Sequence, residues 1–552
     1  MALYGLALVV RALLFALHPD AAYPDSYYYV DVARSLLAGR GFNIDFIWSF
    51  VDVGGRIPAN PTLPIPSNAH WMPLASVVQL PTMWLMGPTP LASAIPFALI
   101  GALAAPLTWH IARQFGAGNW VALAAAVAVA IPAGAAIYMA QPDNFSLYQP
   151  LGLAAMWLIA RGLVGHGRSF ALAGLAVGLA TLARNDGVLL GGAAAVAFAW
   201  DRWRAWRSKG LRSPRIPWRY AFACLGLFLV VMAPWYLRQL AVFGSLSPSS
   251  TSGRILLIAN YEQLNSVTSD TSLAAFLGQG IGPLITSRAL GLVSAIQIFS
   301  VTACSVAIMP FAIVGVWARR RSIEFGPFFI YSGLLFGASA LLFAVHVPYG
   351  TFLHSAVALV PLTFVLGMEG VVIVAAWAAR HRRGWEEQRA ARMFLIAAVG
   401  TVILNAGTFA VLVGQSWDSD RNALVSAGQA IDAAGARTSD LVLSADPGGI
   451  EYFTGRGGVV TPDDSIDVIH RVAEVYGVRW LVLQRTQIVT ALEPVLESKG
   501  RPAWIGSPIY ELPYDGPKTG DPAADAAPAM AVYPVCTTAS DTRCLGIARA
   551  GP

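Results

Sequence analysis

Residues 1–31 read MALYGLALVVRALLFALHPDAAYPDSYYYVD, an apolar stretch followed by a polar segment rich in tyrosine. The apolar part, Met1 to His18, has about the length that an α-helix needs to cross a hydrocarbon core. It lacks a basic leading region, carries Arg11 in its middle and shows no small-residue cleavage site. These features argue against a signal peptide and predict a first transmembrane helix.

The composition of the whole chain agrees with a membrane protein. Of the 552 residues, 56% are hydrophobic and 12% are charged, whereas about 25% of the residues in a soluble domain are charged. The formal net charge is +6, but the basic residues lie in a few short segments between apolar stretches. This arrangement is typical of membrane topology, so we expect no nucleic-acid partner.

Eleven apolar stretches predict an α-helical polytopic membrane protein with about 11 transmembrane helices. They are residues 1–18, 91–112, 120–140, 147–164, 169–183, 187–200, 220–241, 297–317, 325–345, 352–378 and 393–415. The two shortest, 169–183 and 187–200, barely reach the length of a span. They can equally form a re-entrant pair that leaves the sidedness of the other loops unchanged.

Arginine and lysine are concentrated in alternate connections between these stretches. They gather around residues 113, 161–168, 202–219, 319–321 and 380–392. The positive-inside rule makes these connections cytoplasmic, which places a long loop at 19–90 and all residues after 415 outside. The excess of Arg over Lys and the abundance of Ala suggest a GC-rich bacterial genome. We therefore expect a multi-pass protein of a bacterial inner (plasma) membrane, with a cytoplasmic N-terminus.

After Gly414 the composition changes to that of a soluble domain. Strand-like runs at 441–444 and 480–483 lie on either side of a helical pattern at 465–476, and 531–535 is a last strand candidate. We therefore divide the chain into a transmembrane domain, 1–415, and an extracytoplasmic soluble α/β domain, 416–552. Cys536 and Cys544 can close a disulfide loop in an oxidising space, or remain free thiols.

The first outside loop opens with a helical pattern. Apolar residues recur at helical spacing from Tyr29 to Leu37, and Gly39 is placed to end the helix, which we expect to lie along the membrane surface. Asp25 stands at the N-terminus of this helix. It can cap the helix, as Asp after Pro often does, or it can act as a general base at the membrane boundary. The two roles do not exclude each other.

Several short motifs resemble the GT-C superfamily of glycosyltransferases, in particular the protein mannosyltransferase and aminoarabinose transferase group. The run Pro24-Asp25-Ser26-Tyr27-Tyr28, followed by Ala33, Gly39 and Gly41-Phe42, is similar to the family's first-loop signature. Further similar segments are, in chain order, His70 to Leu74, Ala112 to Gly116, Leu182 to Gly187, Pro234 to Arg238, and Phe243-Gly244. The resemblance covers most of residues 1–415 and implies a GT-C-type membrane domain.

The resemblance also implies a role for Asp25. In this family an acidic residue of the first loop is the catalytic base, and the motif match puts that residue at Asp25. Many members carry a second acidic residue directly afterwards, where this chain has Ser26. Asp143, in the short outside connection Gln141-Pro142-Asp143-Asn144, is then the candidate for a second catalytic acid, or else a cap of the next helix.

Candidates for substrate binding lie at the outside ends of the predicted spans. A departing lipid phosphate must be met by cations or oriented donors, and Arg184 and Arg238 can supply them. Each can equally be an interfacial arginine whose head reaches water. His70 and His354 lie near the same boundary, as binding or as structural histidines. In the resembling family, the region that begins at Tyr349 lines the donor cavity.

The motifs predict no nucleotide cofactor, because the sequence holds no P-loop and no paired Gly-rich phosphate cradle. A divalent metal stays undecided. Asp25 and Asp143 could share an ion, but sites made of oxygen ligands alone leave no characteristic spacing in a sequence.

The resemblance thus implies an inverting glycosyltransferase that moves a sugar, mannose or another hexose, from a polyprenyl-phosphate carrier to an extracytoplasmic acceptor. The acceptor would be a protein, a glycolipid or a cell-wall polymer. Two other functions remain open, namely a transporter or flippase of lipid-linked sugars and a membrane sensor with an extracytoplasmic ligand-binding domain. The gathering of polar candidates at one face, not at the bilayer midplane, favours the enzyme over the transporter.

Overall fold

The computed structural model describes residues 1–209, 213–246, 254–518 and 520–536. The chain forms two compact units. Unit 1 comprises Met1–Ala21, Trp71–Ala241 and Ile281–Gln415, and unit 2 comprises Ala22–His70, Val242–Gly280 and Ser416–Pro552. The chain thus changes units after Gln415, where the sequence predicted a soluble domain to begin. Residues 22–70 and 242–280 group with that domain, although the sequence-based division had assigned them to the membrane domain.

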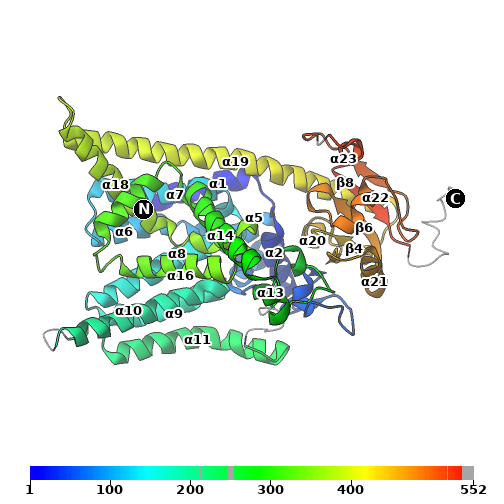
Figure 1. The fold of residues 1–552 in the computed structure, drawn as a ribbon, viewed down its shortest axis with the longest axis horizontal. Coiled ribbons are helices and arrows are strands. Elements are labelled where there is room, and N and C mark those ends of the chain that lie inside the picture. The colour runs from blue at the N-terminus through cyan, green and yellow to red at the C-terminus, as the bar shows by residue number, and fades with distance from the viewer. Residues whose placement is uncertain (210–212, 247–253, 519, 537–552) are drawn as a thin grey trace. The chain divides into compact units, whose positions relative to one another are not determined.

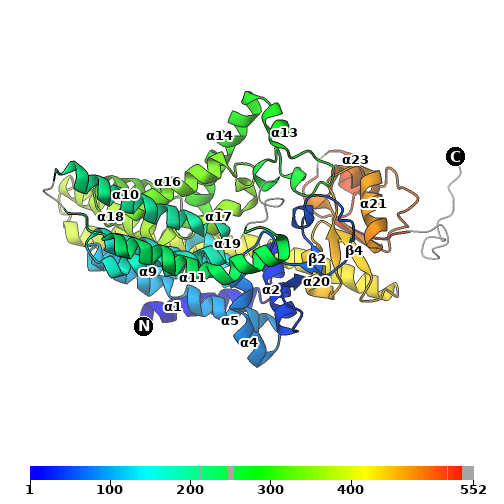
Figure 2. The same ribbon diagram turned by 90° about the horizontal axis from the view of Figure 1, so that it is seen from below.

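Unit 1 is built from helices, many of which run side by side (Figures 1 and 2). In chain order they are α1 (Ala2–Leu17), α3 (Leu74–Val77), α4 (Leu80–Met86), α5 (Pro90–Gly101), α6 (Ala104–Gln114), α7 (Asn119–Ala130), α8 (Phe145–Leu163), α9 (Gly167–Ala183), α10 (Val188–Arg207), α11 (Trp218–Phe243), α14 (Ile281–Ile298), α15 (Met309–Arg319), α16 (Gly326–Leu341), α17 (Thr351–Ala356), α18 (Val360–Arg380) and α19 (Glu387–Ala433). The last of these, α19, continues without interruption from unit 1 into unit 2.

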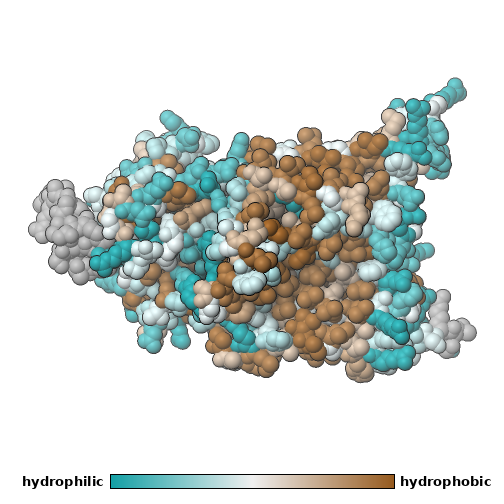
Figure 3. All heavy atoms as spheres, turned by 180° about the vertical axis from the view of Figure 1, so that it is seen from behind, coloured by the Kyte–Doolittle hydropathy of each residue, from teal (hydrophilic) through white to brown (hydrophobic). Residues whose placement is uncertain are grey.

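The helices of unit 1 present a broad hydrophobic band, with a hydrophilic layer at the ends of α10 and α18 (Figure 3). Among the described residues, five helical segments are long and apolar enough to cross a membrane, or six if a bent pair counts as one span. The five are Pro90–Gln114, Trp218–Phe243, Ile281–Cys304, Val360–Arg380 and Glu387–Ala433. Several shorter apolar helices accompany them. The chain therefore has the apolar helices of an integral membrane protein, while the predicted number of about 11 spans is not confirmed.

One predicted span lies elsewhere in the chain. The sequence suggested 297–317, but the apolar helical segment is Ile281–Cys304, which ends in a π-helical stretch at Phe299–Cys304. The backbone becomes extended at Ser305, and α15 begins only at Met309, with Pro310 in its first turn. Proline has no backbone N–H, which suits the first turn of a helix and not its interior. The prediction of a continuous span over 297–317 was therefore wrong.

Two neighbouring helices of unit 1 approach each other through glycine. A Cβ atom added at Gly174 of α9 would collide with the backbone carbonyl of Cys224 in α11, and one added at Gly178 would press on Val231. Small residues four positions apart let two membrane helices pack backbone against backbone. The pair Gly174 and Gly178 therefore fixes the contact between α9 and α11.

Unit 2 contains a six-stranded mixed sheet in the order β2-β5-β4-β6-β8-β7. The strands are β2 (Phe46–Ile47), β4 (Leu441–Ser444), β5 (Gly458–Val460), β6 (Val478–Gln484), β7 (Tyr510–Leu512) and β8 (Met530–Pro534). The first four in spatial order are parallel, and β8 is antiparallel to both β6 and β7. The edge strand β2 comes from the first loop, so this loop and the C-terminal segment build one sheet. A separate two-stranded sheet joins β1 (Asn43–Ile44) to β3 (Ile65–Pro66).

Unit 2 also contains helices, several of which lie around the sheet (Figure 1). They are α2 (Pro24–Leu37), α13 (Leu273–Gly278), α20 (Pro447–Thr454), α21 (Ile466–Tyr476), α22 (Glu493–Leu496) and α23 (Pro522–Ala526). The hydrophobic core joins the end of α19, through Leu424 and Ile431, to the sheet residues Val442, Trp480 and Val532. The structure confirms the strands predicted at 441–444 and 480–483 and the helix predicted at 465–476, and the observed ends lie within two residues of the predicted ones.

The C-terminal tail holds a disulfide-bonded cysteine, Cys536. Its expected partner, Cys544, lies outside the described residues. Cys224 and Cys304 of unit 1 are free thiols and are buried.

Candidate active site

Unit 1 holds a buried polar network that begins where the chain enters α8. Asp143 and Asn144 precede this helix, and both are fully buried. The Oδ2 atom of Asp143 lies 3.6 Å from Nδ1 of His354 in α17. The structure therefore brings together two residues that the sequence had singled out separately, 211 positions apart in the chain.

His354 is held on two sides. Its Nδ1 lies 3.0 Å from Oδ1 of Asn144, and its ring stacks on Phe145 with the ring centres 4.0 Å apart. An amide oxygen only accepts hydrogen bonds, so Nδ1 carries the hydrogen when this bond is made, and Nε2 of the neutral ring is then an acceptor. Asn144 thus selects the tautomer of His354.

Arg184 lies in the turn between α9 and α10 and ties this turn to α17. Its Nε donates to Oδ1 of Asp186 at 2.9 Å, and its Nη2 donates to the backbone carbonyl of Thr351 at 3.2 Å. The hydroxyl of Ser355 donates to Oδ2 of the same Asp186. Arg184 therefore has a carboxylate partner close by, and the turn is fixed next to the helix that carries His354.

Two tyrosines extend the network into the helices behind it. The hydroxyls of Tyr148 in α8 and Tyr331 in α16 lie 3.0 Å apart, and Tyr331 donates to the backbone carbonyl of Ser355 at 3.4 Å. Both rings are fully buried. The sequence analysis gave no role to Asp186, Tyr148 or Tyr331. Asp186 lies in the GT-C-like segment Leu182 to Gly187, where only Arg184 was singled out, and nothing in the immediate sequence of the two tyrosines distinguishes them from ordinary core residues.

The network offers acidic, basic and metal-binding chemistry. Asp143 supplies a carboxylate and His354 an imidazole, and these donor types bind divalent ions such as Zn²⁺ and Mn²⁺. Nδ1 of His354 cannot donate to Asn144 and bind a metal at the same time. These residues can therefore coordinate a divalent ion in one of two ways. His354 binds the ion through Nε2, or its Nδ1 gives up the hydrogen bond to Asn144 and binds the ion instead.

Asp25 belongs to unit 2 and lies in the first turn of α2, half-buried. The cap residue of this helix is Tyr23, and the capping hydrogen bonds are made by Ser26, whose Oγ accepts from the backbone N–H groups of Ala22 and Tyr23 at 3.1 and 3.2 Å. The interpretation of Asp25 as the cap was therefore wrong. A carboxylate in the first turn is still favoured by the helix dipole.

A second group of carboxyls follows along α2. Asp31 is buried, and its Oδ2 accepts from the backbone N–H of Asp45 at 3.1 Å. Burial, together with the negative charge of Glu451 in α20, raises the pKa of Asp31 well above its usual range. Burial likewise raises the pKa of Glu451 to about 7, although Arg34 acts in the opposite direction. The contact between α2 and α20 therefore contains carboxyls that resist ionisation.

The remaining predicted site residues are Arg238, Tyr349 and His70. Arg238 is on α11, where its Nη1 donates to Oε1 of Gln239 at 2.9 Å and its guanidinium lies 5.1 Å from the ring centre of Trp235. Tyr349 is 60% exposed, just before α17. His70 belongs to unit 2 and is half-buried.

Comparison with known proteins identifies the class of this fold. Residues 72–237 match the family model of dolichyl-phosphate-mannose-protein mannosyltransferases. A search of curated protein sequences finds no match. The matched segment contains Asp143 and Arg184 and ends one residue before Arg238.

Solved structures resemble the chain over nearly its whole length. ArnT of Cupriavidus metallidurans, bound to undecaprenyl phosphate, has a TM-score of 0.53 and 14% sequence identity, and the match covers 98% of both chains. The oligosaccharyltransferase of Archaeoglobus fulgidus, in complex with Zn and sulfate, has a TM-score of 0.56 and 13% identity over 93% of this chain and 72% of that one. A second structure, of AglB from the same organism with an inhibitory peptide and dolichol-phosphate, has a TM-score of 0.54 and 13% identity, covering 88% of this chain and 69% of that one. The chain therefore has the GT-C fold, and the resemblance found in its sequence motifs is confirmed.

Proposed function

We propose that the protein is an inverting glycosyltransferase that moves a sugar from a polyprenyl-phosphate carrier to an acceptor outside the cytoplasm. The observation that carries this proposal is the match of the entire chain, both units included, to the fold of ArnT, a protein that binds undecaprenyl phosphate. The match to the mannosyltransferase family model over residues 72–237 supports mannose or another hexose as the sugar.

The proposed reaction uses Asp25 as the general base. The acceptor hydroxyl attacks the anomeric carbon of the sugar while Asp25 takes the hydroxyl proton. The bond between that carbon and the phosphate oxygen breaks, and the polyprenyl phosphate leaves with the electron pair. Attack opposite the leaving group inverts the anomeric configuration. General-base assistance of this kind contributes on the order of a hundred- to ten-thousandfold in rate.

The departing phosphate requires positive charge or hydrogen-bond donors. Arg184 and Arg238 are the proposed cations, with His70, His354 and Tyr349 as further substrate-binding residues. Asp143 is the proposed second acidic residue. With His354 it would hold a divalent ion, whose chemistry would be to stabilise charge on the phosphate. Within unit 1, the ion pair of Arg184 with Asp186 keeps the arginine side chain oriented before a donor binds.

The location of the site explains the choice of donor. Nucleotide sugars are cytosolic, and an active site on the outer face of the membrane cannot reach them. A polyprenyl carrier brings the sugar across the bilayer. The proposed acceptor is a protein, a glycolipid or a cell-wall polymer, because these polar partners are available on that side.

One experiment separates this proposal from a lipid-linked sugar transporter and from a membrane sensor. Purified protein is incubated with a polyprenyl-phosphate hexose and an extract of membrane and envelope acceptors, and free polyprenyl phosphate is measured by mass spectrometry. We expect its release to require both the protein and the extract. Donor that binds to the protein but stays chemically intact in every extract would contradict the proposal.

A further inference from the structure

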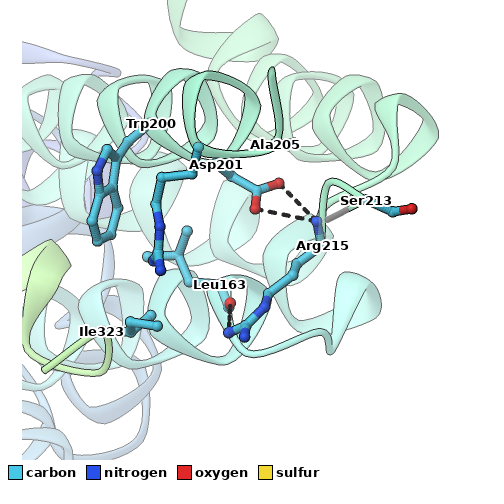
Figure 4. Close-up of a pocket in the computed structure, with 8 residues that line it drawn as sticks. Leu163, Trp200, Asp201, Ala205, Ser213, Arg215 and Ile323 are labelled. Atoms are coloured by element: carbon cyan, nitrogen blue, oxygen red, sulfur yellow. Dashed lines mark hydrogen bonds between the residues drawn. The ribbon is translucent and has the colours of Figure 1, made fainter. Parts of the chain in front are cut away.

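A small pocket lies at the Arg-rich end of unit 1 (Figure 4). Its lining includes Leu163, the last residue of α8, whereas Asp143 precedes the first residue of this helix. Because α8 has 19 residues, the two ends lie about 28 Å apart at ~1.5 Å per residue. The pocket is small and opens to solvent. Its polar lining consists of Asp201, Arg204, Ser213 and Arg215, with Trp200 and Ile323 among its apolar walls. This place is therefore separate from the network around His354.

The pocket is built by specific hydrogen bonds. The carboxylate of Asp201 accepts from the backbone N–H of Arg215 at 2.9 Å (Figure 4). It also accepts from the backbone N–H of Ile216 at 3.0 Å, and these bonds fasten the segment that begins at residue 213 to α10. The side chain of Arg215 then donates to the backbone carbonyl of Leu163, the last residue of α8, at 3.0 Å (Figure 4). The carboxylate of Asp201 is thus hydrogen-bonded to backbone N–H groups, and these bonds position Arg215 at the pocket.

Arg204 supplies the second guanidinium. Its guanidinium carbon lies 4.9 Å from the ring centre of Trp200, and among the described residues it has no carboxylate partner. Both α8 and α10 end at the pocket, and the partial negative charge of a helix C-terminus favours cations there. Arg204 and Arg215 supply these cations. Because a guanidinium has five N–H groups, both side chains have further hydrogen-bond donors available to a ligand in the pocket.

The residues around the pocket have the composition of a membrane interface. Trp203, Trp206 and Trp218 are 47%, 78% and 57% exposed, and exposed tryptophans of membrane proteins typically lie at the level of the lipid headgroups. Besides the two pocket arginines, this segment carries Arg202, Arg207, Lys209 and Arg219. Basic pockets between the ends of membrane helices are suited to anionic headgroups, and each such charge contributes roughly 1 kcal/mol near an anionic leaflet.

We propose that this pocket binds the phosphate group of an anionic phospholipid from the leaflet at this end of unit 1. The two guanidinium groups of Arg204 and Arg215 would bind the phosphate oxygens, Ser213 at the rim would donate a hydroxyl hydrogen, and the acyl chains would lie along the apolar helices. The lipid would act as a structural ligand at the junction of α8, α10 and the segment that follows residue 212. This role goes beyond sugar transfer.

The chain offers a matched pair of variants to test this. Arg204 and Arg207 both lie near the end of α10, and each covers a tryptophan, Trp200 at 4.9 Å and Trp203 at 5.2 Å. Only Arg204 lines the pocket. Full-length wild type, Arg204→Gln and Arg207→Gln are titrated in detergent with phosphatidylglycerol or phosphatidylcholine, and bound lipid is counted by native mass spectrometry. We expect Arg204→Gln to bind phosphatidylglycerol about tenfold more weakly, while Arg207→Gln stays within about twofold of wild type.

Each other outcome contradicts a defined part of the proposal. If phosphatidylglycerol binding weakens equally in both variants, the lipid is held by diffuse electrostatic attraction and the proposed binding pocket is wrong. If the wild type binds phosphatidylcholine as tightly as phosphatidylglycerol, the proposed selectivity for anionic lipid is wrong. Displacement of the lipid by inorganic phosphate at the same concentration would assign the pocket to free phosphate. If Arg204→Gln does not fold, Ser213→Asp places a negative charge at the exposed rim of the pocket, and unchanged phosphatidylglycerol binding in this variant would overturn the proposal.

Discussion

At the scale of single residues, Asp25 and Ser26 divide two roles that the sequence could not separate. Both stand at the start of α2, where either residue type can cap a helix. The structure gives the capping hydrogen bonds to Ser26, including donation of its hydroxyl to the backbone carbonyl of Tyr23 at 2.7 Å. Asp25 is therefore not the N-cap residue of α2, although the helix dipole still favours its carboxylate in the first turn.

This division predicts opposite effects for two neighbouring variants. Asp25→Asn keeps the size of the side chain but removes the basic oxygen, so turnover at saturating donor should fall by about a hundredfold or more, with folding retained. Ser26→Ala should lower stability by about 1 kcal/mol through the lost cap and leave turnover close to wild type. Steady-state kinetics and thermal unfolding of both variants check this. Near-normal turnover in folded Asp25→Asn would move the role of base to Asp143.

Arg184 offers a second test, because its carboxylate partner can be changed separately. If Arg184 meets the donor phosphate, Arg184→Gln should raise the KM for the lipid donor about tenfold or more, since a charge-assisted contact is lost. Asp186→Asn breaks the ion pair but keeps the arginine, so its effect on the KM for the donor should be much smaller. Kinetics at varied donor concentration distinguish the two. Equal changes in both variants would mean that Arg184 only fixes the turn, and Arg238→Gln should then be measured in the same way.

The carboxyls of α2 and α20 predict a dependence of stability on pH. The pKa of Glu451 is raised to about 7 in the folded protein, so its protonated form stabilises the fold at low pH, and this contribution is lost as the pH rises from about 4 through 7. Glu451→Gln should therefore stabilise the protein at pH 8, by on the order of 1–3 kcal/mol, and have little effect at pH 4. Thermal unfolding at both pH values measures this. Glu474→Gln, at an exposed position on α21, is the control, and equal behaviour of the two variants would contradict the prediction.

At the scale of elements, the local sequence pattern predicted those helices and strands whose formation depends on short-range interactions. The strands predicted at 441–444 and 480–483 and the helices that became α2 and α21 followed from short-range periodicity, and the structure has them. The span at 297–317 failed because hydropathy reports that residues are apolar but not where the backbone breaks. Strand β2 was missed because it has only two residues, and its partner β5 lies about 400 positions away, so no local pattern marks it.

Contacts between membrane helices supply a prediction at this scale. Gly174→Leu should prevent the close approach of α9 to α11, because the new side chain would collide with the carbonyl of Cys224. Gly226→Leu is the matched control, since a Cβ at Gly226 meets nothing within 4 Å. The first variant should lose thermal stability by several degrees and the second should not, as measured by unfolding in detergent. A Gly174→Leu protein as stable as wild type would contradict the described packing.

At the scale of the whole molecule, the class of fold could be predicted and the assembly of the site could not. Apolar stretches and ordered motifs indicated the GT-C type, and the structural comparisons confirm it. Asp143, Arg184 and His354 were each singled out, but the contact of His354 with Asn144 joins residues 210 positions apart. A single sequence contains no direct record of such pairs.

The proposed topology is also a property of the whole molecule. The alternation of Arg-rich connections predicts that residues 416–552 lie outside the cytoplasm. A reporter that is active only in the cytoplasm should therefore stay silent when fused after Gly414, and should be active when fused within 202–209. Strong activity after Gly414 would contradict the topology and the proposed location of the site.

The most direct test of the central claim follows a single donor molecule in proteoliposomes that contain the purified protein. A polyprenyl-phosphate hexose, labelled in both the sugar and the lipid, is supplied with an acceptor extract on the side of unit 2. We expect each sugar bound to acceptor to be matched by one free polyprenyl phosphate, with no net movement of intact donor across the bilayer. Intact donor crossing the bilayer without any cleavage would contradict it and indicate a transporter.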